Sequence, residues 1–94
     1  MPYFALLYDL VGDFLPRRAA LRPEHLALAQ QSFTRGEMVL GGAFFEPTDR
    51  ALIIFRAPSK SVPEAFAQND PYVRNGLVKK WEVRAWNVVI GNAE

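Results

Sequence analysis

Residues 38–57, MVLGGAFFEPTDRALIIFRA, contain two apolar segments separated only by a short turn. The first segment runs from Met38 to Phe45 and the second from Leu52 to Ala57, with Glu46 to Arg50 between them. Short, continuously apolar runs bounded by turn residues are typical of buried β-strands. The sequence therefore predicts two consecutive strands with no helix between them.

Helical segments flank this pair of strands on both sides. A helix is expected to begin near Arg22 or Pro23 and to run to about Arg35, because proline suits a first helical turn and Gly36 can end the helix. A second, short helix is expected from Ser61 to about Gln68, with Ser61 as its N-cap and Glu64 completing a capping box.

The ends of the chain supply two further strands. Tyr3 to Val11 is an almost unbroken apolar run, which predicts a strand with both faces buried. Val78 to Ile90 reads as one long strand, and the parity of its bulky residues changes after Ala85, which predicts a bulge or passage onto a partner's sheet. The order of elements is that of an α+β, ferredoxin-like βαββαβ sandwich, and residues 1–94 are expected to form one domain.

The apolar content predicts a partner for the sheet. Half of the 94 residues (50%) are hydrophobic, yet a domain of this size buries only roughly 60–65% of its unfolded surface. Helices of this fold cover one face of the sheet, and the first three strands are apolar at both parities. The other face then needs a cover, and we expect a homodimer through the open sheet face.

Composition also excludes several classes of function. The formal net charge is +1, with no block of like charges, so nucleic acid and anionic membranes are not expected partners. The chain has no Cys and one His, which excludes disulfides, thiolate catalysis and a multi-His metal site, and we expect no metal and no cofactor. The N-terminus lacks a basic region before its apolar residues, so the cytoplasm is the expected location.

The single histidine is the main candidate for chemistry. At 100° per residue, its neighbours on the helix within about 60° are Leu21, Leu28, Ala29 and Ser32, so His25 lies in the stripe expected to be buried. A buried imidazole needs a hydrogen-bond acceptor. Asp70, at the end of the second helix, is a plausible one, and the pair would be the general-base half of a catalytic triad. The alternatives are a hydrogen-bonded core histidine and an aspartate that only forms a turn.

Four segments carry a resemblance to a known family: residues 22–28 (RPEHLAL), Gly41–Gly42, residues 70–77 (DPYVRNGL) and residues 82–88 (EVRAWNV). In order and spacing the chain resembles the YCII (YciI-like) family over essentially its whole length. The resemblance implies a dimeric α+β barrel, similar to muconolactone isomerase, in which His25 and Asp70 face a small cavity. One relative is implicated in removing chloride from a chlorinated hydroxyquinol. Longer relatives have a longer connection where this chain has residues 46–50.

Other residues are weaker candidates for contacts with a substrate. Arg22 lies one helical turn before His25 and could anchor an anionic or phenolate group, or could simply be solvated. Tyr72 could donate a hydrogen bond, and Gly41 and Gly42 could let a ligand approach the backbone or could mark a bulge. Three aromatic side chains could form a wall of the site, or could instead pack in the core or in a dimer interface: Phe44, Phe45 and Trp86. Arg17 and Arg18 are expected to be solvated.

Three functions fit these observations. The first is a cofactor-independent lyase or isomerase, related to a dehydrochlorinase, in which His25 removes a proton from a small aromatic or cyclic metabolite while Asp70 orients the imidazole. The second is a module that binds a small molecule or regulates without turnover. The third is a purely structural tie between the two helices. Replacement of His25 by Ala separates them through its effects on turnover, affinity and stability.

Overall fold

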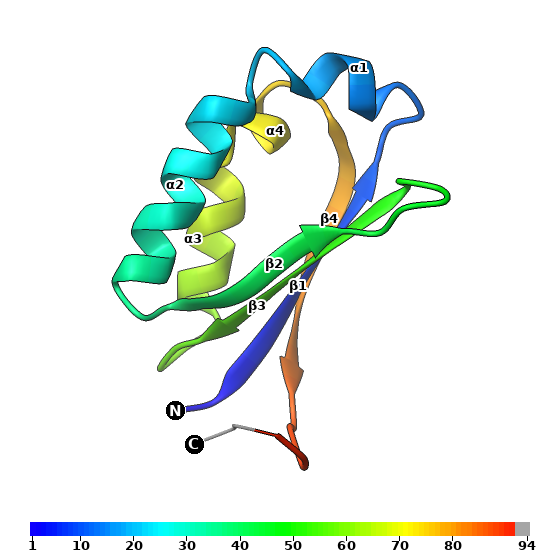
Figure 1. The fold of residues 1–94 in the computed structure, drawn as a ribbon. Coiled ribbons are helices and arrows are strands. Elements are labelled where there is room, and N and C mark those ends of the chain that lie inside the picture. Colours follow the sequence, from blue (N-terminus) through cyan, green and yellow to red (C-terminus); the bar gives the residue numbers. More distant parts are fainter. Residues whose placement is uncertain (92–94) are drawn as a thin grey trace.

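The computed structural model describes residues 1–91, which form a four-stranded antiparallel sheet with helices on one face (Figure 1). The strand order across the sheet is β2-β3-β1-β4. In chain order the elements are β1 (Tyr3–Leu10), α1 (Phe14–Arg18), α2 (Arg22–Thr34), β2 (Met38–Ala43), β3 (Arg50–Arg56), α3 (Ser61–Asn69), α4 (Pro71–Arg74) and β4 (Val78–Trp86). The α+β ferredoxin-like fold expected from the sequence is confirmed. None of the helices in this part of the chain is long and apolar enough to cross a membrane.

The core lies between the helices and the inner face of the sheet. Along β1, every second side chain is buried, and these inner residues are Phe4, Leu6, Tyr8 and Leu10. Leu6 pairs with Ile53 of β3 and Val83 of β4, so the same face of all three strands is buried. The expectation that both faces of β1 are buried is wrong within one chain, because the alternate side chains are only half-buried.

The open face of the sheet is apolar in its middle and charged along β4. Leu7 of β1 is paired with Leu52 of β3 on one side and with Glu82 of β4 on the other. Ala5, two residues before, is paired with Ile54 and Arg84 in the same way. The apolar open face predicted from the first three strands therefore lies over β1 and β3 and extends to Leu40 of β2, which pairs with Ile54. β4 contributes a charged margin.

Two strands end earlier than the sequence pattern indicated. β4 ends at Trp86 rather than Ile90, because Trp86 pairs with Tyr3, the first residue of β1, and the sheet offers no partner beyond it. The change of parity after Ala85 thus marks the point where the chain leaves the sheet. β2 ends at Ala43, so Phe44 and Phe45 lie in the turn and are exposed.

The irregularities of register lie elsewhere than predicted. One lies between Met38 and Leu40 of β2, before the glycine pair. The other lies between Asp9 and Leu10 of β1, opposite the first residues of β4. Each shifts the pairing by one residue near a strand end, where fewer ladder hydrogen bonds are interrupted.

The helices also depart from the expectation in detail. α3 begins at Ser61 with Lys60 as its N-cap, and the cap makes no side-chain hydrogen bond. In the preceding turn, the Val62 N–H donates to the Ser59 carbonyl, and Ser61 lies inside the helix rather than at its N-cap. The predicted Ser61–Glu64 capping box therefore does not form. α1 and α4 are short helices that the sequence pattern did not indicate.

Candidate active site

The site is centred on a contact between α2 and the junction of α3 with α4. His25 Nδ1 lies 2.8 Å from Asp70 Oδ1, and the two side chains are 17% and 0% exposed. Asp70 is the last residue before α4, where Pro71 occupies the first helical position. A proline there disfavours a helical conformation for the preceding residue, so Asp70 adopts an extended backbone and its side chain turns back toward the helix.

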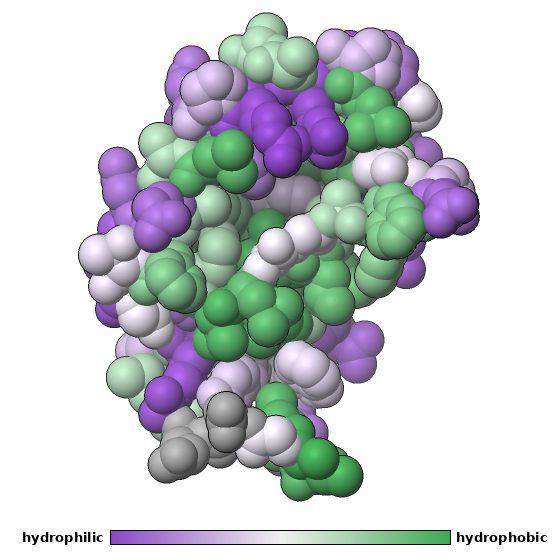
Figure 2. Space-filling model, viewed as in Figure 1, coloured by the Kyte–Doolittle hydropathy of each residue, from purple (hydrophilic) through white to green (hydrophobic). Residues whose placement is uncertain are grey.

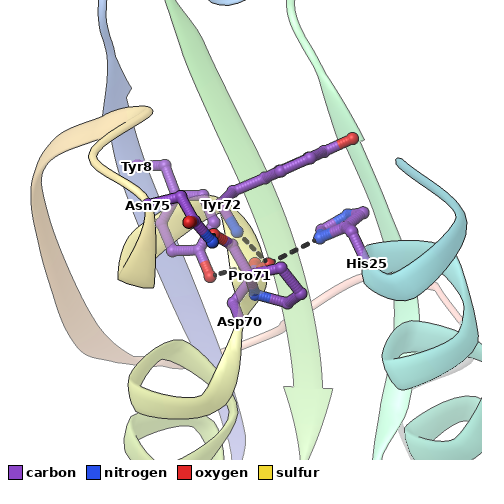
Figure 3. Close-up of polar contacts among 6 residues, drawn as sticks. All are labelled: Tyr8, His25, Asp70, Pro71, Tyr72 and Asn75. Carbon is purple, nitrogen blue, oxygen red and sulfur yellow. Dashed lines mark hydrogen bonds and ion pairs between the residues drawn. The ribbon is translucent and has the colours of Figure 1, made fainter. Parts of the chain in front are cut away.

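Three donors converge on the Asp70 carboxylate (Figure 3). The Tyr72 backbone N–H donates to Oδ1 at 3.0 Å, as in an N-cap. The Tyr8 hydroxyl, from β1, donates to Oδ2 at 2.7 Å. Since the carboxylate accepts, His25 donates from Nδ1, and a neutral imidazole then carries its lone pair on Nε2. Asp70 is thereby fixed in position, and it fixes the tautomer of His25.

Tyr8 is locked into its donor role by its surroundings. The phenol is 1% exposed, and its burial, together with the negative charge and the hydrogen bond of Asp70, raises its pKa far above the ordinary value. Tyr8 therefore keeps its proton throughout the physiological range. A buried donor of this kind holds the carboxylate from the side of the sheet, opposite to the helix that carries His25.

Tyr72 forms the second support of the imidazole. Its ring stacks on that of His25, with centroids 4.0 Å apart and an interplanar angle of 12°. The edge of Phe14 meets the Tyr72 ring at 5.3 Å between centroids. Burial raises the pKa of the Tyr72 phenol, although the nearby positive charges of Arg22 and Arg18 oppose this effect. Tyr72 is therefore a neutral phenol near pH 7.

His25 borders a cavity of about 200 Å³ between α2 and the sheet. Figure 2 shows this hollow beside β2, with a hydrophilic patch along its upper edge. Gly41 and Gly42 form part of the wall. A Cβ at Gly41 would lie 3.3 Å from Ile53, so the small residue keeps β2 close to its neighbour there. Cavities of about 150 Å³ are known to hold benzene, so this one can hold a single substituted ring.

The predicted site residues come together in this region. His25, Arg22, Tyr72, Gly41 and Gly42 line the cavity, and Asp70 lies behind His25 without contact with solvent. The aromatic residues proposed as a wall of the site do not line the cavity. Three side chains of this kind are exposed outside it: Phe44, Phe45 and Trp86.

Two polar residues of the cavity were not predicted from the sequence. Tyr8 lines the cavity as well as binding Asp70, and the signal was a hydroxyl at the buried parity of an apolar strand. Arg18 was expected to be solvated but lines the cavity, because the short helix α1 turns it inward. Within the described residues, no group of three or more His, Asp or Glu side chains is placed to hold a metal ion.

Comparisons with known proteins identify the family and the fold. Residues 1–87 match the family described as YCII-related domain, and the chain belongs to it. Among solved structures, the chain is similar to 5-chloro-2-hydroxyhydroquinone dehydrochlorinase (TftG) from Burkholderia phenoliruptrix AC1100, in complex with 2,5-dihydroxybenzoquinone. The TM-score is 0.77 at 20% identity, over 90% of this chain and 93% of that one.

Two further solved structures share the fold. Protein Atu4242 from Agrobacterium tumefaciens has a TM-score of 0.61 at 17% identity, covering 95% of this chain and 94% of its own. A protein from Deinococcus radiodurans named as a putative antibiotic biosynthesis monooxygenase has a TM-score of 0.56 at 14% identity, over 100% and 98% of the two chains. No curated protein matches the sequence.

Proposed function

We propose that this protein is a cofactor-independent enzyme that removes a proton from a small aromatic or cyclic metabolite, with His25 as the general base. The observation that carries the proposal is the 2.8 Å contact between His25 Nδ1 and Asp70 Oδ1 beside a cavity that His25 lines. A carboxylate on Nδ1 leaves Nε2 as the proton acceptor, which is the arrangement a general base requires.

The reaction needs only groups that this chain provides. His25 Nε2 takes a proton from a C–H or O–H of the bound ring, and the electron pair that remains forms a new π bond in the substrate. In an isomerisation, the π electrons that this new bond displaces take up the proton from His25 at another position. In an elimination, the new π bond expels an anionic leaving group with its bonding pair, and the proton on His25 passes to solvent. Asp70 lies 2.8 Å from the ring nitrogen and stabilises the imidazolium while it holds the proton.

The fold neighbour TftG supports the choice of reaction class. It is a dehydrochlorinase whose structure holds 2,5-dihydroxybenzoquinone, a single-ring compound. Elimination of hydrogen chloride is one case of the proton abstraction described above, and a ring of that size matches the cavity of about 200 Å³. The alternative is a module that binds a small molecule in the same cavity without turnover.

Proton exchange with solvent tests the enzyme against the binder. Single-ring compounds that raise the melting temperature are incubated with the protein in D2O, and loss of an exchangeable C–H signal is followed by proton NMR. Wild type is expected to catalyse exchange, His25→Gln to lose it while keeping ligand affinity to within roughly tenfold, and the exposed control Gln31→Ala to resemble wild type. Absence of exchange with wild type would leave only the binding function, and a His25→Gln variant that exchanges as fast as an active wild type would rule out His25 as the base.

We also propose that two copies pair through the open sheet face. The apolar middle of that face, where the half-buried side chains of Leu7 and Leu52 pair, supports this arrangement. Leu40, paired with Ile54 on the same face, is 61% exposed in the single chain. Leu40→Glu is expected to give a monomer in sedimentation at micromolar concentration, whereas Leu15→Glu, on α1, is expected to leave the dimer intact. A monomeric wild type would contradict the pairing.

A further inference from the structure

Two arginines stand at the cavity without a carboxylate partner. Arg18, the last residue of α1, and Arg22, the first of α2, both line the cavity. Ion pairs occur at other arginines, such as Arg17 with Asp13 and Arg50 with Asp9, but within the described part of the chain none involves Arg18 or Arg22. Two guanidinium groups are thus available to a ligand.

Both guanidinium groups lie near aromatic side chains. The Arg18 guanidinium carbon lies 5.8 Å from the centroid of the Phe14 ring, a cation–π contact. Arg22 lies close enough to the Tyr72 phenol for its positive charge to oppose the rise in the pKa of that group. Neither ring carries a negative charge, so each arginine keeps its charge and its guanidinium donors for another partner.

The cavity contains no negative charge to balance them. None of its lining residues is an Asp or a Glu, and Glu24, next in sequence to His25, is not among them. Asp70 lies beneath His25, with three donors already directed at it. The hydrophilic patch above the hollow in Figure 2 lies at the end of the cavity where α1 and α2 meet. A ligand in this space therefore faces an excess of positive charge.

We infer that the natural ligand is a small ring-bearing anion, whose carboxylate or phenolate oxygen binds Arg18 and Arg22 while its ring lies against His25. Arginine presents a planar fork of donors that suits such oxygens. Arg22 precedes His25 by three residues on α2, so both side chains project from one face of the helix. This inference rests on the proposed function, because it places the charged group of the substrate beside the base.

Matched pairs of anionic and neutral ligands test the inference by binding alone. The probes are benzoate against benzamide and 4-hydroxybenzoate against 4-hydroxybenzamide, measured by calorimetry and thermal shift on the full chain. Each anion is expected to bind at least about tenfold more tightly than its amide, the difference that one charge-assisted hydrogen bond gives. Equal affinity within both pairs, or no binding of any probe at millimolar concentration, would overturn the inference.

Substitutions then identify the arginines that bind the negative charge of the ligand. Arg18→Gln and Arg22→Gln are each expected to remove most of the preference for the anion while leaving the amide affinity unchanged. Arg17→Gln is the control, because Arg17 is adjacent in sequence and equally charged but pairs with Asp13 and does not line the cavity. A similar loss in all three variants would show a diffuse charge effect and contradict a built anion site.

The two proposals fail separately. If anions are preferred but no ligand exchanges protons in a His25-dependent manner, the anion site stands and the enzymatic function falls. If exchange depends on His25 but amides bind as well as their anions, the function stands and the ligand class is wrong.

Discussion

The phenol ring of Tyr72 lies nearly parallel to the imidazole of His25, at 4.0 Å between centroids. Because the backbone N–H of the same residue donates to Asp70, Tyr72 touches both members of the pair. The orientation of the imidazole is therefore set from three sides: by the helix that carries it, by the carboxylate and by the stacked ring. A rigid base of this kind loses little entropy when it meets its substrate.

Truncation of Tyr72 separates its ring from its hydroxyl. Tyr72→Phe keeps the stack and should cost less than about 1.5 kcal/mol of unfolding free energy, because only one hydrogen-bonding group is lost. Tyr72→Ala leaves a cavity in the core and should cost about 3–5 kcal/mol. Urea denaturation monitored by circular dichroism measures both values. Equal costs for the two variants would show that the ring packing is unimportant.

Replacement of Tyr8 by Phe removes the donor to Asp70 Oδ2. The carboxylate is fully buried, so the loss should lower the unfolding free energy by about 1–3 kcal/mol, more than removal of an exposed hydroxyl. Thr34→Val, at an exposed helix end, is the control and should change stability by less than about 0.5 kcal/mol. If Tyr8→Phe is as stable as wild type, the hydrogen bond is not needed to hold Asp70.

The raised pKa of Tyr8 predicts that the stability of the protein falls at alkaline pH. The pKa of Tyr8 is raised in the folded state above its ordinary value of about 10, so above that pH the unfolded chain ionises while the folded chain keeps its proton. The unfolded state then binds fewer protons than the folded state. The contribution of Tyr8 to the free energy of unfolding is therefore constant below pH 10 and decreases above it, by up to about 1.4 kcal/mol per pH unit. Urea midpoints from pH 9 to 11 should fall less steeply in Tyr8→Phe. Parallel curves would contradict the assignment.

Substitution of Asp70 by Asn tests its role in orienting His25. An amide nitrogen directed at Nδ1 would favour the wrong tautomer, so proton exchange in a bound ligand should slow by roughly 10²–10⁴-fold. Ligand affinity should change far less, because Asp70 does not line the cavity. A variant that binds and exchanges as wild type would mean that the carboxylate is only structural.

The sequence was sufficient for the fold because its signals were local and mutually consistent. Two apolar strands are separated by residues 46–50, and a helix with Pro23 near its start and Gly36 after its end precedes them. This arrangement admits few topologies. Strand ends were less predictable, because they depend on a partner: β4 stops at Trp86 where β1 begins, although the chain continues with apolar residues. Such limits are set by pairing rather than by composition.

The site was only partly visible in the sequence. His25 and Asp70 were found because each is unusual in its setting, a lone histidine in an apolar stripe and an aspartate before proline. Tyr8 was missed because a tyrosine in a strand has an ordinary packing role, and its bond to Asp70 spans 62 residues of sequence. Arg18 was missed because its direction depends on α1, a helix of five residues with no periodic pattern to reveal it.

The most direct measurement of the central claim is the protonation of the imidazole itself. His25 is the only histidine, so protein labelled with ¹⁵N-histidine gives one pair of ring nitrogen signals that needs no assignment by mutation. With the side chain neutral, the proposal predicts a proton on Nδ1, directed at Asp70, and a free lone pair on Nε2, which gains a proton when a ligand with an acidic hydrogen is bound. A neutral imidazole with its proton on Nε2 would contradict the assignment of His25 as the base.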